Sequence, residues 1–132
     1  MAGSFSDYLE LKILDHIVGK TSFTMPTCYV GLSTADPLDT AAGLAEPSGN
    51  GYARVTTAGS DWSAAASGAT SNANAITFPT ASGSWGTISH FALFDAATNG
   101  NMLAHGSLSA SQAITTNQIA RFAAGELDIT LG

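Results

Sequence analysis

The stretch "GTISHFALFDAATNGNMLAHGSL", residues 86–108, carries the strongest signal for a defined fold in this chain. Two short runs rich in apolar residues flank the dipeptide Asn99-Gly100. An Asn-Gly pair between two such runs favours a tight two-residue turn, because both residues adopt positive φ at little cost. We therefore predict a β-hairpin with Asn99-Gly100 at its centre, in which residue 94 faces residue 105.

Further strand-like runs lie on both sides of this hairpin. They cover residues 26–33, 51–57, 75–79, 112–116, 119–125 and 126–131. Each run is short, and each is bounded by Gly, Pro, Asn or Ser, which is typical of strands joined by turns. Regular short strands with frequent turns predict an all-β fold, here an antiparallel β-sandwich of jelly-roll-like type.

One helix precedes the strands, in "SFSDYLELKILDHIVGK", residues 4–20. Its apolar residues recur at the spacing of a single helix face. They are Phe5, Leu9, Ile13 and Ile17, with Leu14 and Val18 beside them. Ser4 with Asp7 resembles an N-terminal capping box. We expect a helix over about 4–19 and a β-sandwich over about 26–131, in one domain spanning 1–132, with the apolar helix face buried on its own sheet or on a neighbouring subunit.

The chain carries little charge. Charged residues make up 11% of the sequence, and the formal net charge is −6. The basic residues are Lys12, Lys20, Arg54 and Arg121. Four scattered cations do not neutralise a phosphate backbone or an anionic membrane, so we expect neither nucleic acid nor membrane as a partner. A surface this neutral fits either a protein covered by partners or a small protein kept soluble by its hydroxyls and its net charge.

Cys28 is the one cysteine, so no internal disulfide is possible. It lies in an apolar strand-like run, which predicts a buried, unreactive thiol. The first residues lack the pattern of a secretory signal peptide. No apolar run approaches the ~18 residues that cross a membrane. These features predict synthesis and assembly in the cytoplasm.

The segment "GLAEPSGNGYARV", residues 43–55, is rich in glycine but does not match a phosphate-binding loop. It lacks the lysine of a P-loop, and its Gly-Asn-Gly leads into a strand rather than a helix. We interpret it as a turn. Asp36, Asp39 and Glu46 share the loop that runs into it, and their oxygens make calcium an alternative, although the EF-hand spacing is absent.

The remaining chemistry is also weakly supported. In the predicted hairpin, His90 and His105 lie about 13 Å apart along the strands, too far to share a zinc ion. No nucleophile elbow is present. We therefore predict that the protein is not an enzyme and has no catalytic residues, no cofactor and no metal.

Two long segments, 33–50 and 59–75, interrupt the strands, and long connections are usually functional or disordered. Trp62 and Trp85 lie in turn-rich sequence, where an aromatic ring can line the core, anchor an interface or stack on a sugar. The predicted partner-contact residues are Phe5, Leu9, Asp36, Leu38, Leu44, Trp62 and Trp85.

Several blocks resemble a known family of small structural proteins of tailed bacteriophages and prophages. They are "YVGLSTADP", "GLAEPSGNGYARV", "AITFP", "GSWGTISHFALFDA" and "GNMLAHGSL", and the resemblance extends from about Tyr8 to Leu131. Members of that family are described as tail-fibre-like or as capsid decoration proteins. The resemblance implies a virion structural protein, and it supplies no catalytic residues.

The first hypothesis is a decoration protein that binds the major capsid protein and other copies of itself, as a homo-oligomer, and so stabilises the shell. The alternative is a tail-fibre or tail-tip component that binds tail proteins or a host surface glycan.

Overall fold

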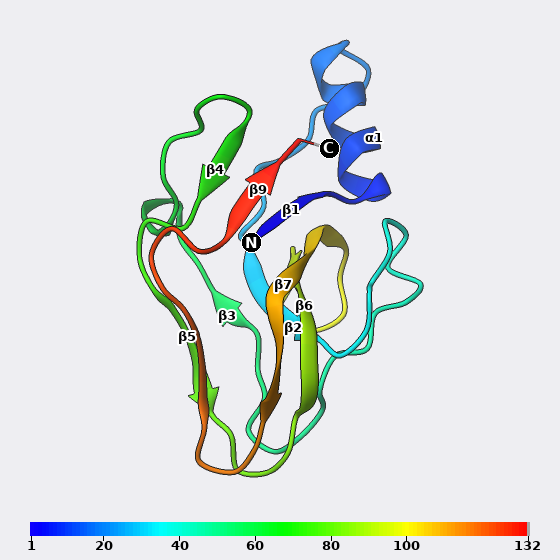
Figure 1. The fold of residues 1–132 in the computed structure, drawn as a ribbon. Coiled ribbons are helices and arrows are strands. Elements are labelled where there is room, and N and C mark those ends of the chain that lie inside the picture. The colour runs from blue at the N-terminus through cyan, green and yellow to red at the C-terminus, as the bar shows by residue number, and fades with distance from the viewer. Residues whose placement is uncertain (132) are drawn as a thin grey trace.

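The computed structural model describes residues 1–131, which form one α-helix and nine strands (Figure 1). In chain order the elements are β1 (Ala2–Phe5), α1 (Asp7–Ile17), β2 (Tyr29–Ser33), β3 (Val55–Thr56), a short 3-10 helix (Gly59–Asp61), β4 (Ala69–Ser71), β5 (Ile76–Thr80), β6 (Gly86–Phe94), β7 (Met102–Ile114), β8 (Ile119–Phe122) and β9 (Asp128–Thr130). The prediction of an all-β fold with one N-terminal helix is confirmed. No helix among these residues has the length and apolar character needed to cross a membrane.

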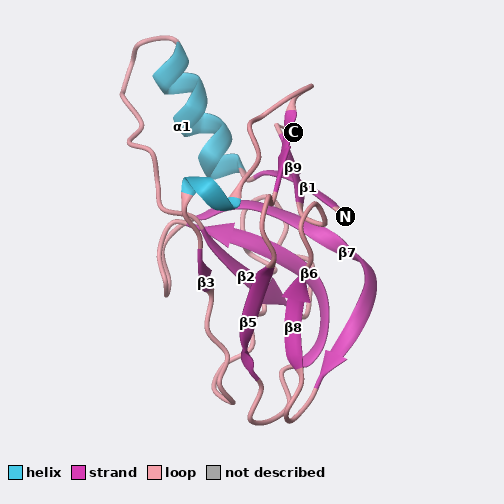
Figure 2. Ribbon diagram, turned by 90° about the vertical axis from the view of Figure 1, so that its left-hand side faces the viewer, coloured by secondary structure: helices cyan, strands magenta, loops and turns pink. Residues whose placement is uncertain are grey.

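The strands form two layers, which lie on either side of the core (Figure 2). The larger layer is a curled seven-stranded sheet with the order β3-β2-β6-β7-β1-β9-β4, and the smaller is the β5–β8 pair. Neighbouring strands are antiparallel except β1 and β9, which are parallel. The sheet is therefore mixed rather than purely antiparallel, because the first and the last strand run side by side in the same direction.

Aromatic rings join the two layers. Phe122 of β8 lies between Phe78 of β5 and Phe91 of β6, with ring centroids 6.1 and 6.2 Å away and both pairs steeply inclined at 69°. Phe91 is completely buried. Edge-on aromatic pairs stabilise a core beyond the burial of their area, so this row of rings fixes the small layer onto the large one.

The hairpin formed by β6 and β7 has a wider turn than the sequence predicts. Phe94 pairs with Met102 and Ala92 pairs with His105, so residues 95–101 form the connection. Asn99 and Gly100 do have positive φ, at 55° and 70°. However, the Asp95 carboxylate accepts hydrogen bonds from the backbone and side-chain N–H groups of Asn101 at 2.7 and 2.9 Å, and this closes a longer loop. The predicted pairing of residue 94 with residue 105 is wrong.

Strand β1 has no counterpart in the sequence prediction, which placed residues 4 and 5 in the helix. It inserts between β7 and β9, and Gly3 faces Gly106 there. A Cβ atom on Gly106 would lie 2.5 Å from the Ala2 carbonyl oxygen and 2.8 Å from the Phe91 ring. The two backbones approach this closely because both residues of the pair are glycine.

The helix begins after this strand. The Ser6 hydroxyl accepts a hydrogen bond from the Leu9 N–H at 3.2 Å and donates one to the Met102 carbonyl at 2.5 Å. Ser6, not Ser4, is therefore the N-cap, and it also ties the helix start to β7. Leu9 is buried and Ile13 is half-buried against the core. Phe5, the first residue of the predicted stripe, lies on β1 and is also half-buried against the core, whereas Leu14, Ile17 and Val18 are exposed.

Candidate functional site

The loop that follows β2, residues 33–50, here called the acidic loop, is tightly folded. The hydroxyl of Ser33, which is completely buried, donates to the Ala35 carbonyl at 2.7 Å and accepts from the Ala45 N–H at 3.1 Å. The Asp36 carboxylate accepts from the Leu38 N–H at 2.9 Å, and Leu38 has a φ of 63°. Local side-chain hydrogen bonds of this kind stabilise a specific turn, so the loop has a defined conformation.

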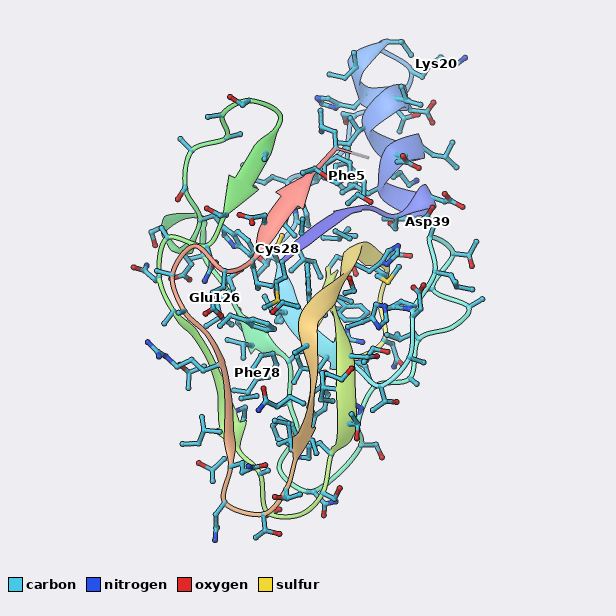
Figure 3. The ribbon with its side chains drawn as sticks, viewed as in Figure 1. Phe5, Lys20, Cys28, Asp39, Phe78 and Glu126 are labelled. Carbon is cyan, nitrogen blue, oxygen red and sulfur yellow. The ribbon has the colours of Figure 1, made fainter. Side chains whose placement is uncertain are left out.

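Three contacts hold the acidic loop against the helix start and β7. Nε2 of His105 lies 2.8 Å from the Asp39 carboxylate, and its Nδ1 lies 3.9 Å from Asp36. The Asp39 carbonyl accepts the Asp7 N–H at 3.0 Å, which satisfies an otherwise free donor of the first helical turn. Figure 3 places Asp39 beside the base of α1. The exposed carboxylates of this loop therefore already have partners within the chain.

The two histidines lie closer together than the sequence predicts. His90 pairs with Ser107 and His105 pairs with Ala92, so the histidines are diagonal neighbours on one face of the sheet. Diagonal neighbours lie about 7–8 Å apart, and the predicted separation of about 13 Å along the strands is wrong because the turn is longer. His90, His105 and Asp36 border a shallow pocket. Within residues 1–131, no group of three or more His, Cys, Asp or Glu side chains is arranged to hold a metal ion.

The calcium alternative also fails on geometry. Asp36 and Asp39 face His105, whereas Glu46 turns inward and binds Arg54. Calcium requires six to eight oxygen ligands around one point. Glu46 points to a different partner from Asp36 and Asp39, so the three carboxylates do not surround one point and the acidic loop does not form that site.

The segment 43–55 contains a largely buried ion pair. The Arg54 guanidinium binds both carboxylate oxygens of Glu46, with Nε at 3.0 Å and Nη2 at 2.5 Å. Its Nη1 donates to the carbonyls of Ala96 and Asn99 at 2.8 Å each, and its Cζ lies 3.5 Å from the Phe94 ring centroid. The Arg54 side chain is only 5% exposed. This arrangement clamps the segment onto the β6–β7 turn.

Tyr52 completes the clamp. Its hydroxyl donates to Glu46 at 2.6 Å and accepts the Leu32 N–H at 3.0 Å. Burial, and then the hydrogen bond to Glu46, raise the pKa of Tyr52 well above its ordinary value. The phenol therefore stays protonated at neutral pH and serves as a donor. The glycine-rich stretch is more than the simple turn predicted from the sequence, because it delivers Glu46, Tyr52 and Arg54 to one buried network.

The two tryptophans differ in their exposure. Trp85 is 3% exposed, its indole N–H donates to the Asn50 carbonyl at 2.8 Å, and its ring lies 5.2 Å from that of Tyr52. Trp62 is half-buried, and its N–H donates to the Thr57 hydroxyl at 3.0 Å. A sugar-binding tryptophan presents an exposed ring, so the structure gives no support to a glycan site at the buried Trp85.

The second long segment, 59–75, is a hairpin rather than an irregular loop. Trp62 bridges to Asn72 and Ala66 bridges to Ala69, with Ser67 and Gly68 in the turn. Residues 63–68 at its tip are all exposed and carry no charge. This hairpin projects from the body of the protein as a neutral arm (Figure 1).

The predicted partner-contact residues fall into three places. Phe5, Leu9 and Trp62 line an apolar cavity of about 280 Å³ beneath α1. Asp36, Leu38 and Leu44 lie in the acidic loop, where Leu38 is exposed and Leu44 is half-buried. Trp85 lies in the hydrophobic core, apart from the other six predicted contact residues. Leu9 and Trp85 belong to the chain's own core, so we withdraw them as contact residues.

Among residues 1–131, a group of exposed apolar side chains lies together on α1. Leu11, Leu14, Ile17 and Val18 are 64%, 60%, 73% and 69% exposed, and we call these four residues the outer face of α1. Three of them, Leu14, Ile17 and Val18, belong to the stripe predicted to be buried on the chain's own sheet or on a neighbouring subunit, and the chain's own sheet does not cover them. Leu11, Leu14 and Val18 are spaced by three and then four residues and so form a second apolar stripe. This spacing could have revealed the outer face from the sequence.

Cys28 directly precedes β2 and lies on the wall of the apolar cavity beneath α1. It is half-buried, and burial, followed by the charge of Asp95, raises the pKa of its thiol. A raised pKa keeps the thiolate population low, in agreement with the predicted unreactive thiol.

The fold is thus that of a small two-layered β protein whose helix leaves apolar side chains exposed. Comparison with known families gives the class a name: residues 4–130 match the family described as Podophage GP4 fiber I protein gp80, and the chain belongs to this family. It is thus a phage virion structural protein of a tail-fibre-like family, as the resemblance in its sequence blocks predicted, and its place is the virion. No curated protein matches it.

Proposed function

We propose that this chain is a subunit of a phage tail fibre and acts as a structural building block without enzymatic activity. The observation that carries the proposal is the match of residues 4–130 to a family named for a podophage fibre protein. The chain needs no cofactor for this role. Its partners are other tail proteins and further copies of itself, reached through exposed surfaces such as the outer face of α1.

Capsid decoration is the second candidate, and one observation favours it. The exposed, uncharged hairpin tip at residues 63–68 suits permanent contact with a neutral protein surface such as the major capsid protein. Under this proposal the tip lies against the shell. Host glycan binding through Trp62 or Trp85 is not proposed, because the indole N–H of each already donates a hydrogen bond to a group of the chain itself.

Gold-labelled antibody against the purified chain, viewed on intact phage particles by electron microscopy, tests the proposal. Label confined to the tail supports a fibre subunit. Label spread over the head overturns the fibre proposal and supports decoration. Particles assembled without this protein serve as the control for antibody that binds other virion proteins.

A further inference from the structure

The outer face of α1 has the geometry of a helix-packing seam. Leu11, Leu14 and Val18 follow the alternating three- and four-residue spacing with which helices pack along one another, and Ile17 lies beside them. All four are at least 60% exposed. The opposite side of the helix, at Leu9 and Ile13, packs on the core. The helix is therefore held on the body by one side, and its exposed seam lies on the other side.

We propose that the outer face of α1 binds the same face of α1 in a second copy of this chain. The two helices pack antiparallel, about a two-fold axis that passes close to Leu14. In this register Leu11 of one copy lies opposite Val18 of the other. The proposal names a partner for the fibre subunit and rests on the proposed function only for its biological setting, because the pairing is a property of the chain in solution.

The charges of Asp7 and Lys20 favour this orientation. Asp7 and Glu10 lie in the first turn and Lys20 lies just beyond the end, while Asp15 in the last turn is also acidic. Figure 3 shows Lys20 extending from the far end of the helix. Antiparallel packing brings Asp7 of one copy near Lys20 of the other and opposes the two helix dipoles. Parallel packing places Asp7 beside Asp7, which like-charge repulsion disfavours.

The size of the seam sets the strength of the contact. A helix of 11 residues is about 16 Å long at 1.5 Å per residue. Two such helices bury less than the roughly 800 Å² per partner of a standard interface. The isolated chain should therefore form a weak, concentration-dependent dimer. Attachment at neighbouring positions in a virion raises the effective concentration and stabilises the same contact.

Sedimentation velocity of the full chain over a range of concentrations, up to millimolar, tests the pairing. We expect a monomer–dimer equilibrium and a loss of at least tenfold in affinity for Leu14→Asp. Ile119→Asp is the matched control, because Ile119 is also exposed, at 55%, but lies on β8. A chain that is monomeric throughout, a trimer, or equal loss in both variants overturns the proposal. Thermal unfolding of each variant shows that it is folded.

Cysteine cross-linking tests the orientation. Leu11→Cys and Val18→Cys proteins, each in a Cys28→Ala background, are mixed and oxidised. Antiparallel packing predicts mainly the mixed disulfide between positions 11 and 18. Predominant 11–11 and 18–18 products overturn the antiparallel arrangement. These solution results do not depend on where the protein lies in the virion, so their failure is distinguishable from failure of the fibre proposal.

Discussion

Strand β6 and helix α1 each present a row of large apolar side chains, but the two rows meet opposite environments. On β6, Ile88 and Phe91 are 2% and 0% exposed, because β5 and β8 cover them. On α1, Leu14 and Ile17 are 60% and 73% exposed. Folding buries the apolar side chains of β6, whereas those on the outer face of α1 remain exposed. Ile88 and Phe91 therefore contribute to stability, whereas Leu14 and Ile17 are available for the pairing proposed above.

The largest expected effect breaks the comparison at its buried side. Phe91→Ala should lower the free energy of unfolding by about 4 kcal/mol, since it opens a cavity between the two layers. Leu14→Ala should change it by less than about 0.5 kcal/mol, as is usual for exposed positions. Urea unfolding of dilute protein, followed by circular dichroism, measures both. Equal losses would show that α1 contributes to the fold as much as β6 does.

The next effect concerns the buried ion pair. Glu46→Gln should lower the free energy of unfolding by about 3 kcal/mol, because it leaves the Arg54 guanidinium buried without its counter-charge. Asp39→Asn, on the 60% exposed carboxylate of the same loop, should cost less than about 1 kcal/mol. A second change, Arg54→Met, made together with Glu46→Gln, should recover part of the loss. A small effect of Glu46→Gln alone would contradict the clamp described above.

A third test sharpens the difference between the sheet and the rest of the chain. Gly106→Ala should cost about 2 kcal/mol, since its methyl group meets the Ala2 carbonyl and the Phe91 ring. Gly59→Ala is the control, because a Cβ there meets nothing within 4 Å and φ is not positive. Differential scanning calorimetry compares the two melting temperatures. A Gly106→Ala protein as stable as the control would mean that β1 is loosely held.

The smallest effect is a pH dependence from Tyr52. Its pKa in the folded chain is raised above the ordinary value of 10.0, so above about pH 10 the unfolded chain loses its phenolic proton first. The stabilising contribution is fully present below about pH 10 and is lost as the pH rises further. Urea midpoints measured from neutral to alkaline pH should fall less steeply for Tyr52→Phe than for the natural chain. Parallel curves would remove Tyr52 as the cause.

The sequence predicted the elements better than their connections. Periodicity revealed the helix and the strands of the β6–β7 hairpin, because burial imposes a repeat on the residues. The register was missed because Asp95, a residue outside the Asn-Gly signal, closes the turn. Strand β1 was missed because "AGSF" has no apolar alternation; it belongs to the sheet through the contact of Gly3 with Gly106, which is non-local.

The candidate surfaces were harder to predict. A helix with two apolar stripes looks like one broad buried face in a sequence, and only the structure shows that Leu9 is covered while Leu14 is not. The network of Glu46, Tyr52 and Arg54 was hidden for a similar reason. Its members are close in sequence, but they are buried because Arg54 packs on Phe94 and binds the β6–β7 turn, about 40 residues further on in the chain.

The pairing of β1 with β9 has a consequence for the order of folding. Ser4 lies opposite Thr130, so nearly the whole described chain separates the two strands that pair here. Contacts between such distant segments form slowly, because a long loop must close before the contact is made. We therefore expect β9 to join the sheet late, and until then the edge of β1 that β9 occupies stays unpaired and open to other strands.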